Sequence, residues 1–254
     1  MDAEAMSRRL GLVVGTVIVL AWSLGACLSN TPPDPAAADL KSGLAAFRAA
    51  PLLRIDGQVA DAGRRYHVDM SFVGTSTTGT LNAEGDVVDF YTTQDGIFMS
   101  SSTLVLRVKP SAAPATRNHW FKAPQIPETQ LVAKLLDRPT VTNAIGQSRK
   151  FSETAGELSG QRVKKLANAA AVVYLSADSP YRLLRVETAA GASLLDGLSD
   201  LAIDVVSYDA GAKVPAPGVI INLDDTSTYP PYYVSVAQSF SFDNCDMSRC
   251  PMSA

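Results

Sequence analysis

The chain has 254 residues, is 46% hydrophobic, and carries 25 acidic and 22 basic side chains for a net charge of -3. The net charge is weakly negative and the sequence has no strongly basic segment, which argues against binding to nucleic acid. We therefore expect no nucleic-acid partner. The length is sufficient for one sizeable core and marginal for two.

The N-terminal segment has the pattern of a bacterial lipoprotein signal peptide. Arg8 and Arg9 precede an uncharged apolar run over residues 10–24, and two small residues then lead to Cys27. A positive region, an apolar region and small residues before a cleavage point are typical of export signals. We predict a signal peptide over residues 1–26 and acylation at Cys27, with palmitate among the attached chains. The alternative is an uncleaved transmembrane anchor, because the run approaches the ~20 residues of a membrane span.

Both interpretations place the rest of the chain on the extracytoplasmic face of the cell membrane. Residues 27–37 are rich in Pro, Ala and polar side chains, which predicts a flexible tether between the lipid anchor and the folded part. An amphipathic helix is expected over residues 38–49, where Leu40, Leu44 and Phe47 share one side.

From residue 52 the period of the hydrophobic residues changes from that of a helix to two, which predicts strands. Asp-Gly at residues 95–96 is a hairpin signal, because this dipeptide tolerates the positive φ of a type I′ turn. We predict a loop over residues 110–116. The strands expected in this half of the chain are 53–59, 65–72, 76–81, 85–93, 97–102 and 118–121.

The period lengthens again over residues 127–147, where we expect one or two short helices interrupted by Pro139. After these helices, strands are predicted at 156–166, 169–177, 181–190 and 201–208. The order of elements predicts an α+β fold with a large curved antiparallel sheet and helices on one side.

In this order the segments resemble a family of mycobacterial cell-envelope lipoproteins that includes LppX, LprA, LprF and LprG, with a LolA-like fold. The segments that carry the resemblance include DLKSGLAAFRAA, RRYHVDMSF, RNHWFKA and GELSGQRVKKL, and together they span residues 38–213. The family implies a half-barrel sheet whose concave face is covered by helices and encloses an apolar cavity for acyl chains. Residues 38–213 are therefore expected to form a lipid-binding domain.

Adaptable and aliphatic side chains suit flexible acyl chains better than a planar ligand. Ordinary core packing is the alternative explanation for the same apolar residues. The residues expected to line the cavity are Met70, Phe72, Phe90, Met99, Leu131, Leu135, Val141 and Ile145.

Residues 214–254 form a Pro-rich extension beyond the usual end of the family. Cys245 and Cys250 are the two cysteines left after Cys27, and an even remainder suits an oxidising compartment, so we expect a disulfide between them. The alternatives are two free thiols or a metal site, and the absence of a nearby histidine argues against a metal.

Known catalytic motifs are missing from the sequence, including a Gly-x-Ser-x-Gly elbow, a phosphate loop and His-Glu-x-x-His. We therefore expect no enzymatic activity, no cofactor and no metal. His67 and His119 are expected to be solvated, as are the acidic residues that might attract calcium (Asp224, Asp225, Asp243 and Asp246). A basic cluster, expected to be solvated but able to face lipid phosphates, comprises Arg149, Lys150, Arg162, Lys164 and Lys165.

Together these features predict an exported actinobacterial-type lipoprotein that binds lipid or lipoglycan acyl chains and carries or presents them in the cell envelope. Its expected partners are a lipid or glycolipid ligand, the cell membrane through the N-terminal anchor, and an envelope protein. The alternative is a non-enzymatic adaptor that docks a sensor or a transporter, with the sheet serving as scaffold. A hydrolase would require an unexpected cluster of polar groups in the fold.

Overall fold

The computed structural model describes residues 34–116, 119–147, 150–195, 197–209, 214 and 219–230. The sheet lies in one compact unit, which begins at Ala36. Cys27, Cys245 and Cys250 lie outside the described residues, so the lipid anchor and the disulfide remain predictions.

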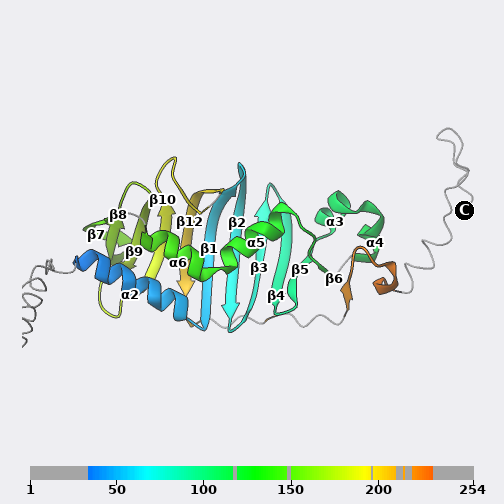
Figure 1. Cartoon of the computed structure of the whole chain (residues 1–254), viewed down its shortest axis with the longest axis horizontal. Helices are drawn as coiled ribbons and strands as arrows, with labels where there is room; N and C mark the ends of the chain where they lie inside the picture. The colour runs from blue at the N-terminus through cyan, green and yellow to red at the C-terminus, as the bar shows by residue number, and fades with distance from the viewer. Residues whose placement is uncertain are drawn as a thin grey trace, which may run out of the picture. The chain divides into compact units, whose positions relative to one another are not determined.

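One open sheet of thirteen strands forms the body of this unit (Figure 1). The spatial order is β13-β6-β5-β4-β3-β2-β1-β12-β10-β9-β8-β7, and β11 pairs with β12 outside this path. Every pairing is antiparallel except that of β13 with β6. The first strands are β1 Leu52–Asp61, β2 Arg64–Val73, β3 Ser76–Ala83, β4 Asp86–Thr93, β5 Gly96–Ser100 and β6 Trp120–Lys122. The others are β7 Ser152–Leu158, β8 Gln161–Ala167, β9 Ala171–Ser176, β10 Leu183–Thr188, β11 Ser193–Leu195, β12 Leu198–Ser207 and β13 Ile220–Ile221.

Three helices, α2, α5 and α6, lie across one face of this sheet (Figure 1). Their bounds are α2 Pro35–Ala49, α5 Pro127–Leu136 and α6 Arg138–Gln147. The remaining helical segments are α3 Ser102–Val108, η2 Pro110–Ala112, α4 Ala113–Thr116 and η3 Thr226–Thr228. The predicted α+β fold, a large antiparallel sheet with helices on one side, is therefore confirmed.

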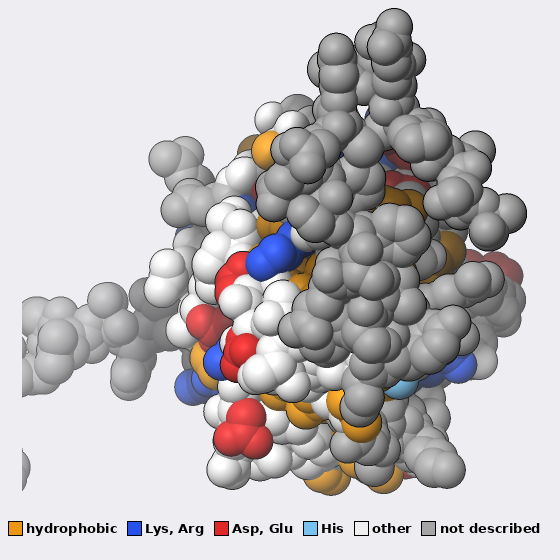
Figure 2. All heavy atoms as spheres, turned by 90° about the vertical axis from the view of Figure 1, so that its right-hand side faces the viewer, with side chains coloured by type: hydrophobic (Ala, Val, Ile, Leu, Met, Phe, Trp, Pro, Cys, Tyr) orange, Lys and Arg blue, Asp and Glu red, His pale blue; other side chains and the backbone are white. Residues whose placement is uncertain are grey.

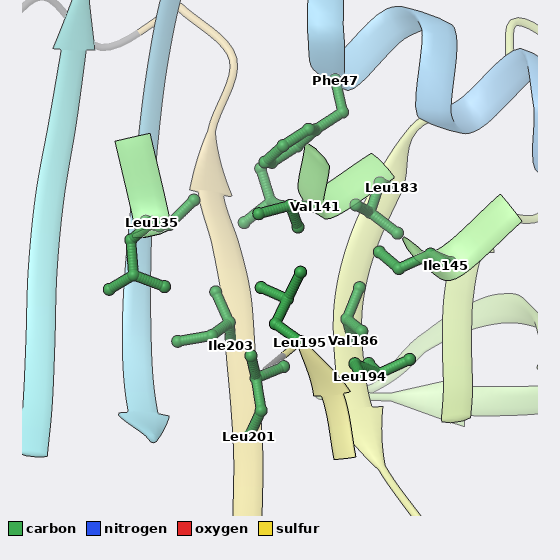
Figure 3. A pocket seen from close by; sticks show the side chains of 12 residues that line it. Phe47, Leu135, Val141, Ile145, Leu183, Val186, Leu194, Leu195, Leu201 and Ile203 are labelled. Atoms are coloured by element: carbon green, nitrogen blue, oxygen red, sulfur yellow. The ribbon is translucent and has the colours of Figure 1, made fainter. Parts of the chain in front are cut away.

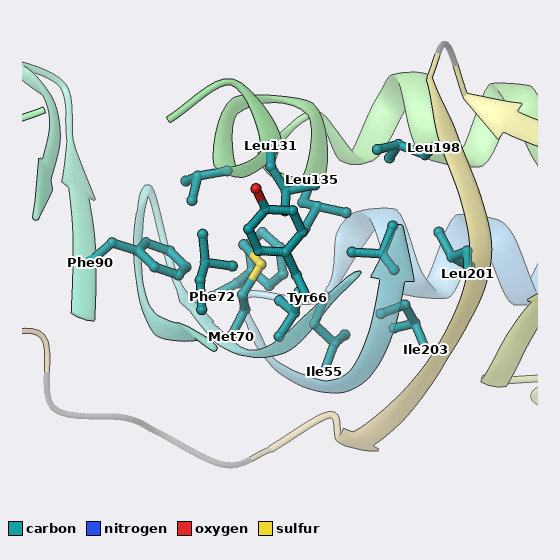
Figure 4. Packing of buried hydrophobic residues seen from close by; sticks show 14 of the residues in the cluster. Ile55, Tyr66, Met70, Phe72, Phe90, Leu131, Leu135, Leu198, Leu201 and Ile203 are labelled. Carbon is teal, nitrogen blue, oxygen red and sulfur yellow. The ribbon is translucent and has the colours of Figure 1, made fainter. Parts of the chain in front are cut away.

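The alternation of side chains along β2 shows why the sheet has one covered face. Tyr66, Val68 and Met70 are buried beneath the helices, whereas Arg65 and His67, at the alternate positions, are exposed. Successive side chains of a strand point to opposite faces, so this pattern presents one apolar row to the helices. Figure 4 shows the resulting core, in which Leu131 and Leu135 of α5 pack against this row.

A glycine in β3 allows the large side chains of this core to lie close to the sheet. Met70, Gly79, Phe90 and Met99 are successive cross-strand partners in β2, β3, β4 and β5. A Cβ atom at Gly79 would lie 2.9 Å from Cζ of Phe90 and 2.2 Å from the carbonyl oxygen of Asp69. The Phe90 ring thus occupies space that any larger residue at position 79 would need.

The first helix begins earlier than predicted. Residues 35–37, expected in the tether, form the start of α2. Proline is well tolerated in the first turn of a helix, because the missing N–H would have no partner inside the helix there. The predicted tether therefore reaches no further than residue 34.

The single strand predicted over residues 156–166 is wrong. The structure has a hairpin of β7 and β8 whose turn is Ser159–Gly160, with φ angles of 51° and 81°. Positive φ at both central residues is the geometry of a type I′ turn, and glycine adopts it at little cost. The Ser-Gly dipeptide was the turn signal that the prediction overlooked.

The segment between β5 and β6 is helical, although a loop was predicted over residues 110–116 and no helix over 102–108. The hydroxyl of Ser101 accepts a hydrogen bond from the backbone N–H of Leu104 at 3.3 Å and so caps the start of α3. Pro110 stands in the first turn of η2, where its missing N–H costs nothing.

Two helices over residues 127–147 are confirmed, but Pro139 does not break them. The break lies at Asp137, and Pro139 occupies the first turn of α6. The carboxylate of Asp137 accepts a hydrogen bond from the backbone N–H of Thr140 at 3.0 Å and starts the new helix.

Part of the predicted C-terminal extension belongs to the sheet. β13 pairs in parallel with β6, and Ile221 and Leu223 are buried in the common core. Asp224 is paired with Lys109 at 3.0 Å, which joins this segment to the residue that follows α3. Residues 219–230 are therefore integrated with the fold and are not an appended tail.

Candidate functional site

An apolar cavity lies between the three covering helices and the strands β1, β10, β11 and β12. Phe47 of α2 and Val141 and Ile145 of α6 point into it from the helical side (Figure 3). Leu135 of α5 closes it beside β1. The strands contribute Ile55, Leu183, Val186, Leu194, Leu195, Leu201, Ile203 and Val205.

The free volume of this cavity is small. Its volume is about 40 Å³. A cavity of ~150 Å³ lined by similar residues is known to accommodate benzene. The cavity thus has room for a few atoms in this conformation, and an acyl chain requires its walls to separate.

The walls of the cavity differ in exposure. Val141 of α6, Leu194 and Leu195 of β11 and Val205 of β12 are only partly buried, whereas Ile145 and Leu183 are almost fully buried. The apolar lining therefore includes both partly exposed and buried side chains.

Three of the predicted lining residues, Leu135, Val141 and Ile145, are brought together in this cavity. Phe72 lines a separate cleft near the ends of β2 and β3. The other four predicted residues are fully buried in the hydrophobic core, three on the sheet and one on α5. They are Met70, Phe90, Met99 and Leu131. The lipid-binding role of all eight remains a prediction.

Several lining residues were not predicted, although β12 carried a readable signal. Leu201, Ile203 and Val205 alternate with less apolar positions, which marks one face of a strand. Phe47 was correctly assigned to the apolar side of its helix. Its place at the cavity depends on how α2 crosses the sheet, which its own sequence does not encode.

Polar contacts hold α6 against α2. Nη1 of Arg138 donates to the carbonyl oxygens of Phe47 and Ala50 at 3.3 and 2.8 Å. Arg48 donates to the hydroxyl of Thr142 at 2.7 Å. These groups can exchange their protein partners for water, so the two helices can separate without leaving a buried charge unpaired.

Ion pairs hold α5 at both ends. Oε1 of Glu128, which is 98% buried, accepts from Arg64 at 2.8 Å and from Arg107 at 2.5 Å. Lys134 pairs with the buried carboxylate of Asp61 at 2.8 Å. The hydrogen bond to Glu128 raises the pKa of Arg107 above its ordinary value. Because separating buried partners is costly, α5 is anchored more firmly than α6.

Lys164 of the basic cluster and the acidic residues Asp224 and Asp225 make structural contacts. Lys164 pairs with Asp39 and Glu153, and its hydrogen bonds raise its pKa above the ordinary value. Asp224 pairs with Lys109, and Asp225 caps η3 through Ser227. Residues Arg149, Asp243 and Asp246 lie outside the described part of the chain.

No group of three or more metal-binding side chains occurs among the described residues. His67 is half-exposed and lies 3.1 Å from Asp56 on the uncovered face of the sheet, as expected for a solvated histidine. In the same described ranges, no helix has the length and apolar character needed to cross a membrane.

No family model matches the chain, and no curated protein does. Among solved structures, LprF from Mycobacterium bovis is similar, with 11% identity and a TM-score of 0.46 over 73% of this chain and 98% of that chain. The Mycobacterium tuberculosis lipoprotein LppX has 13% identity and the same TM-score over 72% of this chain and 100% of that chain. LprF and LppX are both among the proteins named in the resemblance drawn from the sequence.

Proposed function

We propose that the protein is an exported, membrane-anchored lipoprotein that binds the acyl chains of a lipid or lipoglycan and carries or presents them in the cell envelope. The observation that supports this proposal is the cavity beneath α6, whose twelve lining residues are all apolar. Ligand-binding sites are typically lined by apolar side chains, as this cavity is.

Burial of methylene groups would supply the binding energy. Each methylene transferred from water is favourable by ~0.8 kcal/mol, so the length of the chain determines affinity without a polar contact in the cavity. In this mechanism α6 moves away from β11 and the chain occupies the space between them. The motion exposes the cavity while α5, held by Glu128 and Lys134, stays on the sheet.

The proposed activity makes and breaks no covalent bond. The cavity walls offer a ligand only hydrocarbon, and neither histidine of the chain lines them. Acylation at Cys27 would hold the domain at the extracytoplasmic membrane surface, where two acyl chains give stable anchoring. A lipid ligand would then be taken from, or delivered to, the adjacent membrane.

Native mass spectrometry of the full-length protein, purified from its own host, tests this proposal. We expect a mass increase that corresponds to one lipid and disappears after extraction with organic solvent. A fluorescent fatty-acyl probe should bind the extracted protein and compete with the native lipid. Absence of lipid in the native protein, together with no uptake of the probe, would contradict the proposal.

A docking function is the second candidate, supported by exposed apolar side chains at one end of the sheet. Leu106 and Val108 of α3 and Val219 and Ile220 at β13 are exposed there. Figure 2 faces this end and shows hydrophobic side chains among charged ones. Under this alternative the same native mass spectra would contain a stoichiometric protein partner and no lipid.

A further inference from the structure

A second cleft lies at the junction of α5 and α6, next to the apolar cavity. Its volume is about 340 Å³, and its walls include the turn after β2, the start of β3, the end of β4 and the α5–α6 junction. The two sites meet at consecutive residues, since Leu135 lines the apolar cavity while Leu136 and Arg138 line the cleft.

The floor of this cleft is a row of four cross-strand partners. Phe72, Thr77, Thr92 and Ile97 are paired in succession across β2, β3, β4 and β5, so all four face the helices. The next row into the sheet, from Met70 to Met99, is apolar and covered. Thr77 and Thr92 therefore place two hydroxyl groups on the covered face, next to the hydrocarbon of the Met70 row.

The hydroxyls of Thr77 and Thr92 are positioned to bind a ligand. Both residues are more than 90% buried. Oγ1 of Thr92 accepts from the backbone N–H of Thr77 at 3.1 Å, which leaves its own hydrogen free to donate. In the part of the chain that the structure describes, the hydroxyl of Thr77 has no hydrogen-bond partner. Among the described residues the only buried side-chain oxygen without a hydrogen-bond partner is Oε2 of Glu128, so the Thr77 hydroxyl is reached by solvent from the cleft.

Arg138 provides a positive charge beside these hydroxyls. Its guanidinium lies 4.9 Å from the centre of the Phe72 ring, and only its Nη1 donates to carbonyl oxygens. Within the described ranges Arg138 forms no ion pair; the carboxylate of the preceding Asp137 accepts from Thr140 instead. Nε and Nη2 are thus available, and an arginine with two free donors suits a phosphate group.

We infer that this cleft binds the phosphate of a lipid head group through Arg138, Thr77 and Thr92, while the acyl chains occupy the neighbouring cavity. The inference rests on the proposed function and deepens it by defining the class of lipid as phosphate-bearing. The two sites adjoin at the α5–α6 junction, so a lipid whose polar end leaves the cavity beside Leu135 would meet Arg138.

Calorimetric titration of the full-length protein tests the inference. The probes are a short-chain phosphatidic acid, the diacylglycerol with the same two chains, and inorganic phosphate. We expect phosphatidic acid to bind at least tenfold more tightly than diacylglycerol. The substitution Thr77→Val should reduce this preference several-fold with diacylglycerol affinity unchanged, and Arg138→Gln should nearly abolish the preference.

Matched controls separate head-group recognition from damage to the fold. Thr80→Val removes a hydroxyl from the opposite face of the same strand, and Arg162→Gln removes an exposed arginine of β8. Both should keep the full preference for phosphatidic acid. Because Arg138 also caps α2, the melting temperature of its variant is measured, and Thr77→Val provides the test that leaves this cap intact.

The possible outcomes distinguish the two proposals. Equal affinity of the wild-type protein for both lipids would overturn the head-group site and leave the acyl cavity supported. Inorganic phosphate binding as tightly as phosphatidic acid would show that the cleft is a site for free phosphate, which also overturns the inference. Failure of both lipids to bind would contradict the proposed function itself.

Discussion

Side chains of the same type, at similar positions in the covering helices, differ in how tightly their surroundings are packed. Val132 of α5 and Val141 of α6 are both valines on the apolar sides of covering helices. Val132 is fully buried against the sheet, whereas Val141 borders the cavity and is partly exposed. Close-packed surroundings resist added volume, and a partly open cavity wall does not.

This difference gives a prediction for the substitution Val141→Trp. The added ring should fill space in the cavity, so uptake of a fluorescent acyl probe should fall at least tenfold while the melting temperature changes little. The control Val132→Trp should overpack the core and cost about 1–3 kcal/mol of stability. Strong destabilisation by Val141→Trp, with no probe bound by the wild-type protein, would show that the cavity is ordinary core.

At the scale of elements, the two helices beside the cavity are attached in different ways. α6 is connected to α2 by hydrogen bonds from Arg48 and Arg138, all at least partly open to solvent. α5 is held by Glu128 and Lys134, whose partners connect it to β1, β2 and α3. The cover of the sheet therefore consists of an anchored helix and a more easily displaced one.

The substitution Glu128→Gln tests the anchor of α5. It keeps the shape of the side chain but removes the charge that Arg64 and Arg107 share, and a hydrogen bond to a charged group contributes about 1.5–3 kcal/mol. Since both arginines are partly exposed, we expect a loss near the lower end of that range in a denaturant titration. Glu157→Gln, on an exposed position of β7, should change stability by less than about 0.5 kcal/mol. Equal stability of the two variants would show that the ion pairs do not anchor α5.

The whole molecule is expected to act at a membrane surface through its N-terminus. The apolar cavity and the second cleft, in which we place the phosphate of a lipid, lie on the same covered face of the sheet. They lie on either side of the α5–α6 junction. A domain held at the membrane by acyl chains would meet lipids at high local concentration. Anchoring and binding would then be separate properties that can be removed independently.

The substitution Cys27→Ala should remove membrane anchoring and leave lipid binding intact. We expect the variant to leave the membrane fraction unlipidated, because the thiol that accepts the lipid is gone, while acyl-probe binding by the domain is unchanged. Fractionation of the host cells and mass spectrometry of the protein provide the two measurements. A variant that stays bound to the membrane as firmly as the wild-type protein would show that residues 10–24 form a span.

Periodicity of apolar residues was sufficient to predict most of the sheet, the helix before it and the pair of helices over residues 127–147. These patterns are local, since a strand such as β2 shows its covered face in alternate residues. Errors occurred where a short signal was overlooked, as at Ser159–Gly160, or where a segment is stabilised by distant contacts. β13 is an example, because two residues become a strand only beside β6.

The binding sites depended on tertiary structure to a greater degree. The sequence by itself indicated an apolar face and placed Leu135, Val141 and Ile145, which line the cavity, among the candidates. It could not separate them from Met70 or Phe90, because core and cavity walls use the same side chains and differ only in the packing above them. The phosphate cleft was not predicted, since Thr77, Thr92 and Arg138 are ordinary residues until strand register and the α5–α6 junction bring them together. Local sequence determined which residues face the helices, and only the crossing of the helices over the sheet decided where space remains between them.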